Sequence, residues 1–144
     1  MNLLTKHIFV LFLMLFSMVV KAEDPGLKFD PQRFQVALEQ FIVKEAGLSP
    51  QESAHFFPLY REMQNKQRSL FVQMRGLRHV DTRDDKASME AIRKLDELEL
   101  QMKKIQQSYH SRFMKVIPAG KVFQVIRAEE KFHRQAFRRA FERR

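Results

Sequence analysis

Cysteine and tryptophan are absent from this sequence of 144 residues, and glycine and proline are scarce, with four and five copies. Without cysteine there can be no disulfide and no thiolate ligand, so stability must come from a hydrophobic core. A chain of this length can bury enough surface for that. We also find no alternating apolar pattern and no Asn-Gly or Asp-Gly turn between apolar runs, the usual signals of strands and hairpins. These absences favour a single all-α domain.

The N-terminus has the order of a cleavable signal peptide. Lys6 precedes an apolar run from Ile8 to Val20, and the small residue Ala22 follows it. The run is shorter than the roughly 20 residues that cross a bilayer. Because Lys21 is unusual so close to a cleavage site, retention of the segment as an anchor stays open. We therefore predict a signal peptide at 1–22, a flexible leader at 23–30, a helical domain at 31–144, and export of the chain.

The chain is basic, with a formal net charge of +9. Such a charge often indicates nucleic-acid binding, but export removes that class of partner. Outside the cytoplasm, positive charge is expected to attract acidic proteins and anionic membrane surfaces. We therefore predict no nucleic acid among the partners.

Apolar spacing and capping residues predict four helices. The first runs from Pro31 to Ala46, capped by Asp30 and ended by Gly47. The second begins at Ser49, where Ser49-Pro50-Gln51-Glu52 forms a capping box, and ends at about Leu77 to His79. Its interior Pro58 predicts a kink near Ala54 to Pro58.

The third helix is expected to begin at a second capping box, Thr82-Arg83-Asp84-Asp85, and to end near Lys115. Pro118 then opens the fourth helix, whose arginine-rich end from Arg138 onward is expected to fray. The apolar stripe of the third helix includes Ile92, Leu95, Leu98, Met102, Ile105, Tyr109, Phe113 and Val116. That of the fourth includes Val122, Phe123, Ile126, Phe132, Ala136, Phe137 and Phe141.

Two helix starts form a short repeat: Leu48-Ser49-Pro50-Gln51-Glu52 and Ile117-Pro118-Ala119-Gly120-Lys121. They resemble the Leu-Thr-x-x-Gln segments of the periplasmic family that includes Spy, CpxP and the zinc-resistance-associated "heavy-metal sensor" proteins. Phe56-Phe57-Pro58-Leu59-Tyr60 and Ala128-Glu129-Glu130-Lys131-Phe132 are similar to its Bacteroidetes-type members. The resemblance implies a periplasmic, hooked four-helix hairpin that forms a homodimer. Some members hold unfolded clients without ATP, some inhibit a sensor kinase, and some bind zinc.

The two repeats differ from the family pattern at their last positions, where Glu52 and Lys121 stand instead of glutamine. If the two turns meet as the resemblance implies, these opposite charges would form an ion pair. We state that pair as a prediction.

Neither metal nor catalytic motifs stand out. No two of the histidines at 55, 79, 110 and 133 have the spacing of a helical ligand pair. Glu129 and His133 share a helical face at four-residue spacing, and His79 and Asp81 share a loop. Two ligands do not complete a zinc site. Nucleophile-elbow, P-loop and zincin motifs are missing as well. We expect no enzyme activity and no cofactor, and zinc is the metal that the resemblance leaves open.

Basic residues alternate with aromatic and methionine residues on the second and fourth helices. We predict that this surface binds clients through Phe56, Phe57, Arg61, Met63, Phe71, Met74, Arg75, Phe132 and Arg134. The alternative is that these apolar residues form an ordinary core flanked by solvated bases. We interpret the protein as a holdase-type chaperone or envelope-stress accessory for unfolded or acidic clients. A metal-responsive sensor and a regulatory partner of a sensor kinase's periplasmic domain remain as alternatives.

Overall fold

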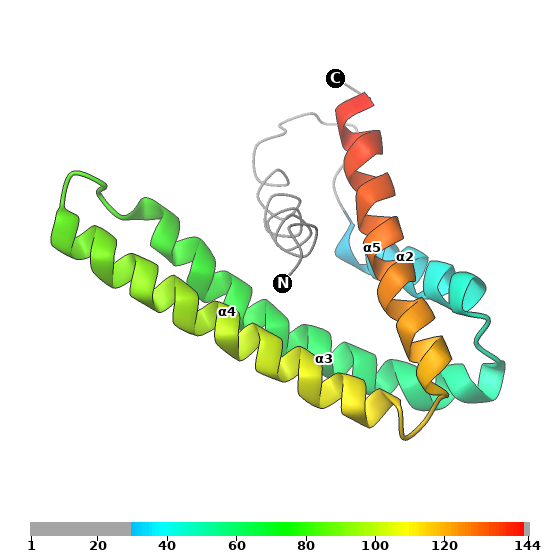
Figure 1. Ribbon diagram of the computed structural model, residues 1–144. Helices are drawn as coiled ribbons and strands as arrows, with labels where there is room; N and C mark the ends of the chain where they lie inside the picture. Colours follow the sequence, from blue (N-terminus) through cyan, green and yellow to red (C-terminus); the bar gives the residue numbers. More distant parts are fainter. Residues whose placement is uncertain (1–29, 143–144) are drawn as a thin grey trace. The chain divides into compact units, whose positions relative to one another are not determined.

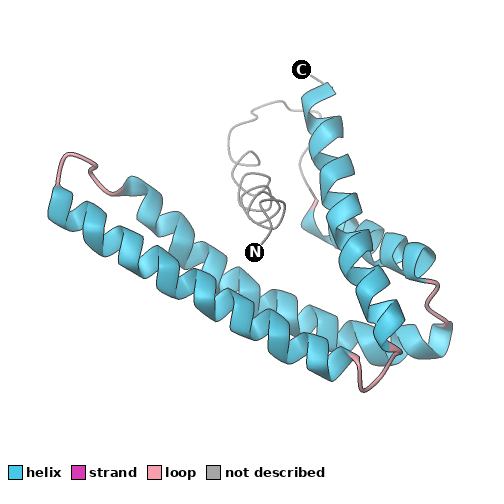
Figure 2. Cartoon of the chain, in the orientation of Figure 1, coloured by secondary structure: helices cyan, strands magenta, loops and turns pink. Residues whose placement is uncertain are grey.

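The computed structural model describes residues 30–142, and the predicted signal peptide, leader residues 23–29 and residues 143–144 lie outside them. Its elements are α2 (Pro31–Ala46), α3 (Pro50–Gly76), the short 3-10 helix η1 (Leu77–His79), α4 (Asp85–Phe113) and α5 (Ala119–Glu142) (Figure 1). No strand occurs among the described residues (Figure 2). The predicted all-α, four-helix fold is confirmed.

The ends of α2 follow from its flanking residues. The Asp30 carboxylate accepts hydrogen bonds from the backbone N–H groups of Gln32 and Arg33, at 2.9 and 3.3 Å. Gly47 ends the helix with φ of 61°, a left-handed conformation that glycine adopts without a Cβ clash. Both capping residues were predicted from the sequence.

Helix α3 begins at Pro50, directly after Ser49, and continues through Pro58. Proline cannot donate the hydrogen bond to the carbonyl of Ala54, four residues earlier. Both Ala54 and Pro58 are exposed, so water can satisfy that carbonyl. The helix therefore passes the proline without ending.

The start of α4 differs from the prediction. Asp84, not Thr82, caps the helix, and its carboxylate accepts the backbone N–H of Ala87 at 2.9 Å. Asp81 binds both the backbone N–H and the guanidinium of Arg83, at 2.8–3.0 Å. These local bonds hold the preceding residues in a turn, and helix formation starts two residues later than the predicted capping box requires.

The described chain divides into two compact units, one of residues 50–119 and one of residues 30–49 with 120–142. In the first unit, α3 and α4 lie side by side as a helical hairpin (Figure 1). Its core side chains are Phe56, Phe57, Tyr60, Met63, Leu70, Met74, Leu98, Met102, Tyr109 and Phe113.

In the second unit, α2 packs against α5 through aromatic contacts. The Phe132 ring lies 5.3 Å from the Phe34 ring and 5.4 Å from the Phe41 ring, between centroids. Other buried residues of this unit are Leu38, Ile42, Ala46, Leu48, Val122, Val125, Ala128 and His133. Helix α5 runs on to Glu142, through the segment that we expected to fray.

Three predicted core residues are exposed: Phe123 at 61%, Ile92 at 62% and Val116 at 36%. Phe123 and Ile92 lie beside the buried stripe of their helix, not on it, and Val116 lies after the end of α4. Each residue of a helix turns by about 100°, so Phe123 leaves the direction of Val122, which continues through Val125 and Ala128. The predicted core position Phe141 has no described side chain.

None of the helices within residues 30–142 combines the length and the apolar character needed to cross a bilayer.

Candidate functional site

Four of the predicted client-binding residues belong to the hairpin core. Phe56, Phe57, Met63 and Met74 are at most 6% exposed. The Phe56 ring lies 5.2 Å from that of Phe57 and 4.8 Å from that of Phe113 across the hairpin, between centroids. In this conformation these side chains offer no surface to a client. These four residues therefore follow the alternative interpretation, in which the apolar residues form an ordinary core.

Three predicted residues of α3 remain at the surface: Arg61 is exposed, and Phe71 and Arg75 are half-buried. Seven residues make nearly two helical turns, so Arg61, Arg68 and Arg75 fall on one face of α3. The neighbouring side chains are the half-buried Phe71 and Val72, which is 59% exposed. We call these five residues the α3 basic row.

The client-binding residues predicted from the sequence did not include Arg68 or Val72, although Arg68 is one of the basic residues that mix with apolar ones on the second helix. The seven-residue spacing of the arginines is the sequence signal that identifies the row. Arg61 also lies over Phe57, with its guanidinium carbon 6.0 Å from the ring centroid. That contact joins the row to the core beneath it.

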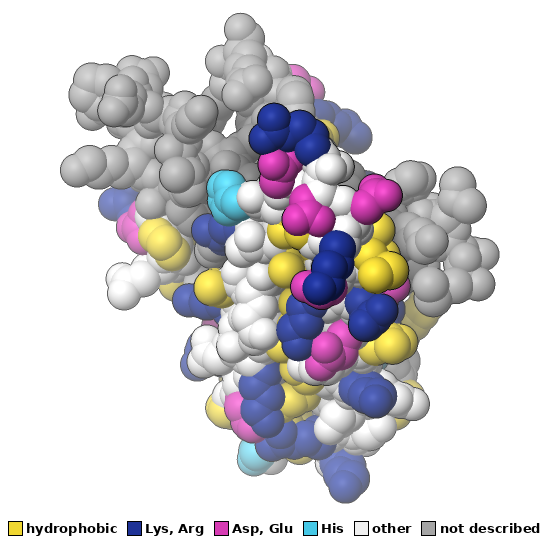
Figure 3. Space-filling model, turned by 90° about the vertical axis from the view of Figure 1, so that its left-hand side faces the viewer, with side chains coloured by type: hydrophobic (Ala, Val, Ile, Leu, Met, Phe, Trp, Pro, Cys, Tyr) yellow, Lys and Arg dark blue, Asp and Glu magenta, His cyan; other side chains and the backbone are white. Residues whose placement is uncertain are grey.

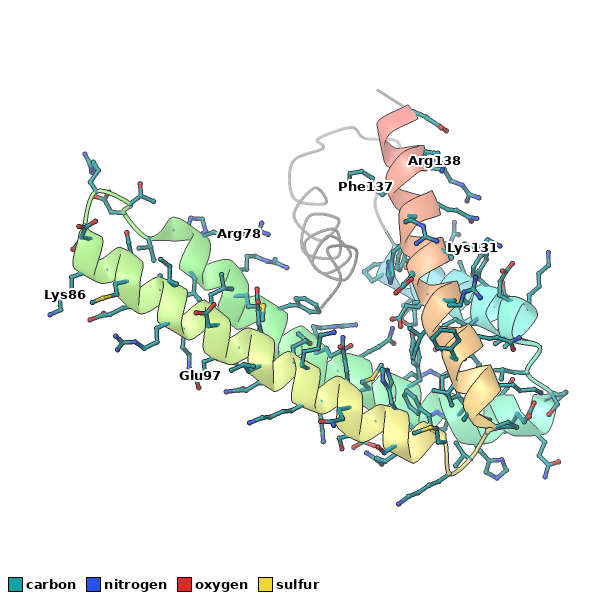
Figure 4. All side chains as sticks on the ribbon, viewed as in Figure 1. Arg78, Lys86, Glu97, Lys131, Phe137 and Arg138 are labelled. Carbon is teal, nitrogen blue, oxygen red and sulfur yellow. The ribbon has the colours of Figure 1, made fainter. Side chains whose placement is uncertain are left out.

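Figure 3 shows that basic and hydrophobic side chains also lie next to one another elsewhere on the surface. Lys and Arg side chains are spread among hydrophobic ones, and acidic side chains lie between them. In Figure 4, Arg78 lies in η1, directly after α3, and Lys86 lies at the start of α4, so positive charge reaches the tip of the hairpin.

A polar network connects α3 with α4. Glu62 accepts a hydrogen bond from the Tyr109 hydroxyl at 2.5 Å and two from the Arg112 guanidinium at 3.1 and 3.2 Å. The Lys66 ammonium lies 3.6 Å from the same carboxylate. The Arg112 guanidinium also stacks over the Tyr109 ring, 4.6 Å from its centroid.

Hydrogen bonds from Arg112 and Tyr109 lower the pKa of Glu62 to about 2. The carboxylate is therefore ionised and already bound at neutral pH, which suits a structural role better than proton transfer. Sequence reasoning did not find this network, because Glu62 is about fifty positions from its partners and only the hairpin brings them together.

The predicted residues of α5 have different surroundings. Phe132 packs between α5 and α2, as described above, and is half-buried. Arg134 is exposed, and its guanidinium nitrogen lies 3.9 Å from a carboxylate oxygen of Glu130. Only Arg134 is placed to meet a partner directly.

The turns at the two repeats are built on buried aliphatic residues. Leu48 is buried, and its backbone N–H donates to the carbonyl of Val43 at 3.1 Å. Ile117 is also buried, and Pro118 directly precedes the start of α5. The Lys121 ammonium donates to the carbonyl of Gly47 at 2.9 Å, where α2 ends.

That bond gives Lys121 a role at the C-terminus of α2, where a positive charge interacts favourably with the helix dipole. Glu52 is half-buried in the first turn of α3. The ion pair between Glu52 and Lys121 stays a prediction.

Among the described residues, no third possible metal ligand lies close to the candidate pair Glu129 and His133. Within the described part of the chain, no three His, Cys, Asp or Glu side chains gather closely enough to hold a metal ion. His133 is buried among aromatic rings, 6.2 Å from the Phe34 centroid and 6.1 Å from that of Phe132. This burial lowers the pKa of His133 to about 4.

Comparison with known proteins adds no identity: no family model matches the chain, and neither a curated protein nor a solved structure matches it. The resemblance at the two helix starts therefore stays a prediction.

Proposed function

We propose that this protein is an exported, ATP-independent chaperone of the holdase type, or an accessory protein of the envelope-stress response, that binds unfolded acidic clients. One observation supports the proposal most directly. The α3 basic row places three arginines at seven-residue intervals beside the half-buried Phe71 and the exposed Val72. Arg68 and Arg75 flank these two apolar residues along the helix, and Arg61 extends the positive charge by two further turns.

The spacing of the row suits an unstructured chain. At about 1.5 Å per residue, successive arginines are separated by roughly 10 Å along the axis of α3. An extended segment covers that distance with about three residues. Acidic residues at such intervals could each meet one guanidinium, and apolar residues between them could rest on Phe71 and Val72.

Binding of this kind requires neither a nucleotide nor a reacting group. Long-range attraction between opposite charges would speed the encounter, and apolar contact would slow the release. The Debye length is about 8 Å at physiological salt, so added salt should weaken the capture of acidic clients. The polar network of Glu62 would hold α3 in place during binding.

The test is suppression of client aggregation by the purified protein without ATP, over a range of salt concentrations. We compare it with the triple variant Arg61→Gln/Arg68→Gln/Arg75→Gln. The matched control is Lys86→Gln/Arg93→Gln/Lys104→Gln, which removes three exposed positive charges from α4. Both variants should keep the far-UV circular dichroism of the parent.

We expect the parent and the control to suppress aggregation equally, more strongly at low salt, and the α3 variant to lose most of this activity. If all three proteins suppress aggregation to the same extent, the row is not the binding surface. If the parent shows no suppression at any salt concentration, the chaperone proposal itself is wrong.

A further inference from the structure

Helix α2 and helix α5 enclose a polar hollow of about 310 Å³. Its lining includes Glu45 from α2 and Arg127, Ala128, Glu130, Lys131 and Arg134 from α5. Ala128 is buried and lies among the longer side chains of this lining. The hollow belongs to the unit of residues 30–49 and 120–142, and it shares no residue with the α3 basic row.

Three positive side chains surround this space. Arg127, Lys131 and Arg134 stand at positions i, i+4 and i+7 of α5, which place them on one face of the helix. In Figure 4, Lys131 and Arg138 leave α5 on the same side, while Phe137 leaves it on the other. The basic face therefore continues beyond the hollow toward the end of α5.

The existing contacts leave hydrogen-bond donors available. The Lys131 ammonium lies 2.7 Å from the Glu45 carboxylate and 5.7 Å from the centroid of Phe41, which fixes it at the edge of the hollow. The separation of 3.9 Å between Arg134 and Glu130 is too long for a hydrogen bond. Among the described residues, none forms an ion pair or a hydrogen bond with the Arg127 guanidinium.

We propose that this hollow binds a phosphate group, carried either by free phosphate or by the headgroup of an anionic phospholipid. A phosphate offers three or four acceptor oxygens, which the two guanidinium groups and one ammonium group can contact together. Three positive charges exceed the two carboxylates of Glu45 and Glu130, so the hollow favours an anion. Its volume is at the lower end for ligand sites, which suits one small group.

The first test is calorimetric titration of the purified protein with inorganic phosphate, and it involves no client. The double variant Arg127→Gln/Arg134→Gln should bind phosphate at least about tenfold more weakly, because each arginine supplies charge-assisted hydrogen bonds. The control Arg93→Gln/Lys104→Gln removes two positive charges from α4 and should bind as the parent does. Equal weakening in both double variants would show that net charge alone attracts phosphate and would overturn the site.

The second test uses Glu45, whose carboxylate competes with the ligand for Lys131. Glu45→Gln should tighten phosphate binding by about two- to fivefold, the range expected for an exposed ion pair. The control Glu90→Gln, on the exposed surface of α4, should change the affinity less. An unchanged or weaker affinity in Glu45→Gln would contradict the assigned geometry.

Vesicles distinguish the two sources of the phosphate group. We would sediment the protein with phosphatidylcholine vesicles that do or do not contain phosphatidic acid. Retention that requires both phosphatidic acid and the two arginines would assign the headgroup, and phosphate binding without such retention would assign the free anion. If neither phosphate nor phosphatidic acid binds in a way that depends on Arg127 and Arg134, the proposal is wrong.

Discussion

Replacing Phe56 by alanine is expected to destabilise the α3–α4 hairpin by about 3–5 kcal/mol. The side chain is fully buried and contacts Phe57, Tyr60 and Phe113. Loss of its apolar surface accounts for about 1.5–3 kcal/mol. The cavity left behind adds about 24 cal/mol for each Å³ that does not collapse, and the lost ring contacts add to it. The assay is urea unfolding followed by far-UV circular dichroism.

The informative comparison is with Phe71→Ala, in the same helix. Phe71 is half-buried, so we expect a loss of only about 1 kcal/mol but a clear drop in aggregation suppression. Phe56→Ala should retain suppression under conditions in which it stays folded. If Phe56→Ala unfolds at the urea concentration of the parent and yet loses suppression, then Phe56 is a client contact and our assignment to the core is refuted.

Three further changes test individual features of the structure. Asp84→Ala should lower the free energy of unfolding by about 1 kcal/mol, because α4 loses its cap. The control Thr82→Ala should change it by less than about 0.5 kcal/mol. Equal effects of the two substitutions in urea unfolding would contradict the cap assignment. Gly47→Ala should cost about 1–2 kcal/mol because its φ of 61° is left-handed, and a neutral result in thermal unfolding would argue against that conformation. The pKa of His133 falls from 6.5 to about 4 on folding, because the ring is buried. As pH drops, the unfolded chain therefore takes up the proton before the folded chain does. The free energy of unfolding should decrease by about 3 kcal/mol between pH 6.5 and pH 4. In His133→Leu, unfolding measured over that pH range should lack this decrease, and an unchanged slope would show that another group causes it.

The helices and most of their ends were predictable from the sequence, because the signals that set them are local. Asp30, Pro31 and Gly47 act through neighbours within a few positions, and the structure has α2 where these residues predict it. The start of α4 was predicted less well, because several residues that can cap a helix lie close together there. Thr82 and Asp84 are both residue types that cap helices, and only the hydrogen bonds show that Asp84 serves the cap while Asp81 binds Arg83 in the turn.

Burial within the apolar stripes was harder to predict. Periodicity identified the faces of α4 and α5 that carry apolar residues, but Ile92 and Phe123 lie at their margins and are exposed. A stripe fixes the direction of a helix face only to within about one residue step, which is roughly 100°. The packing partner decides which edge of the stripe is covered.

The sequence by itself therefore determined the all-α class, the four helices and the excess of positive charge, since these depend on composition and on residues a few positions apart. Tertiary structure alone decided that Phe56, Phe57, Met63 and Met74 form a core while the α3 basic row stays at the surface. It also decided the larger groupings, the Glu62 network across the hairpin and the hollow between α2 and α5. These groupings join residues far apart in the chain, and their contacts form only when the helices pack.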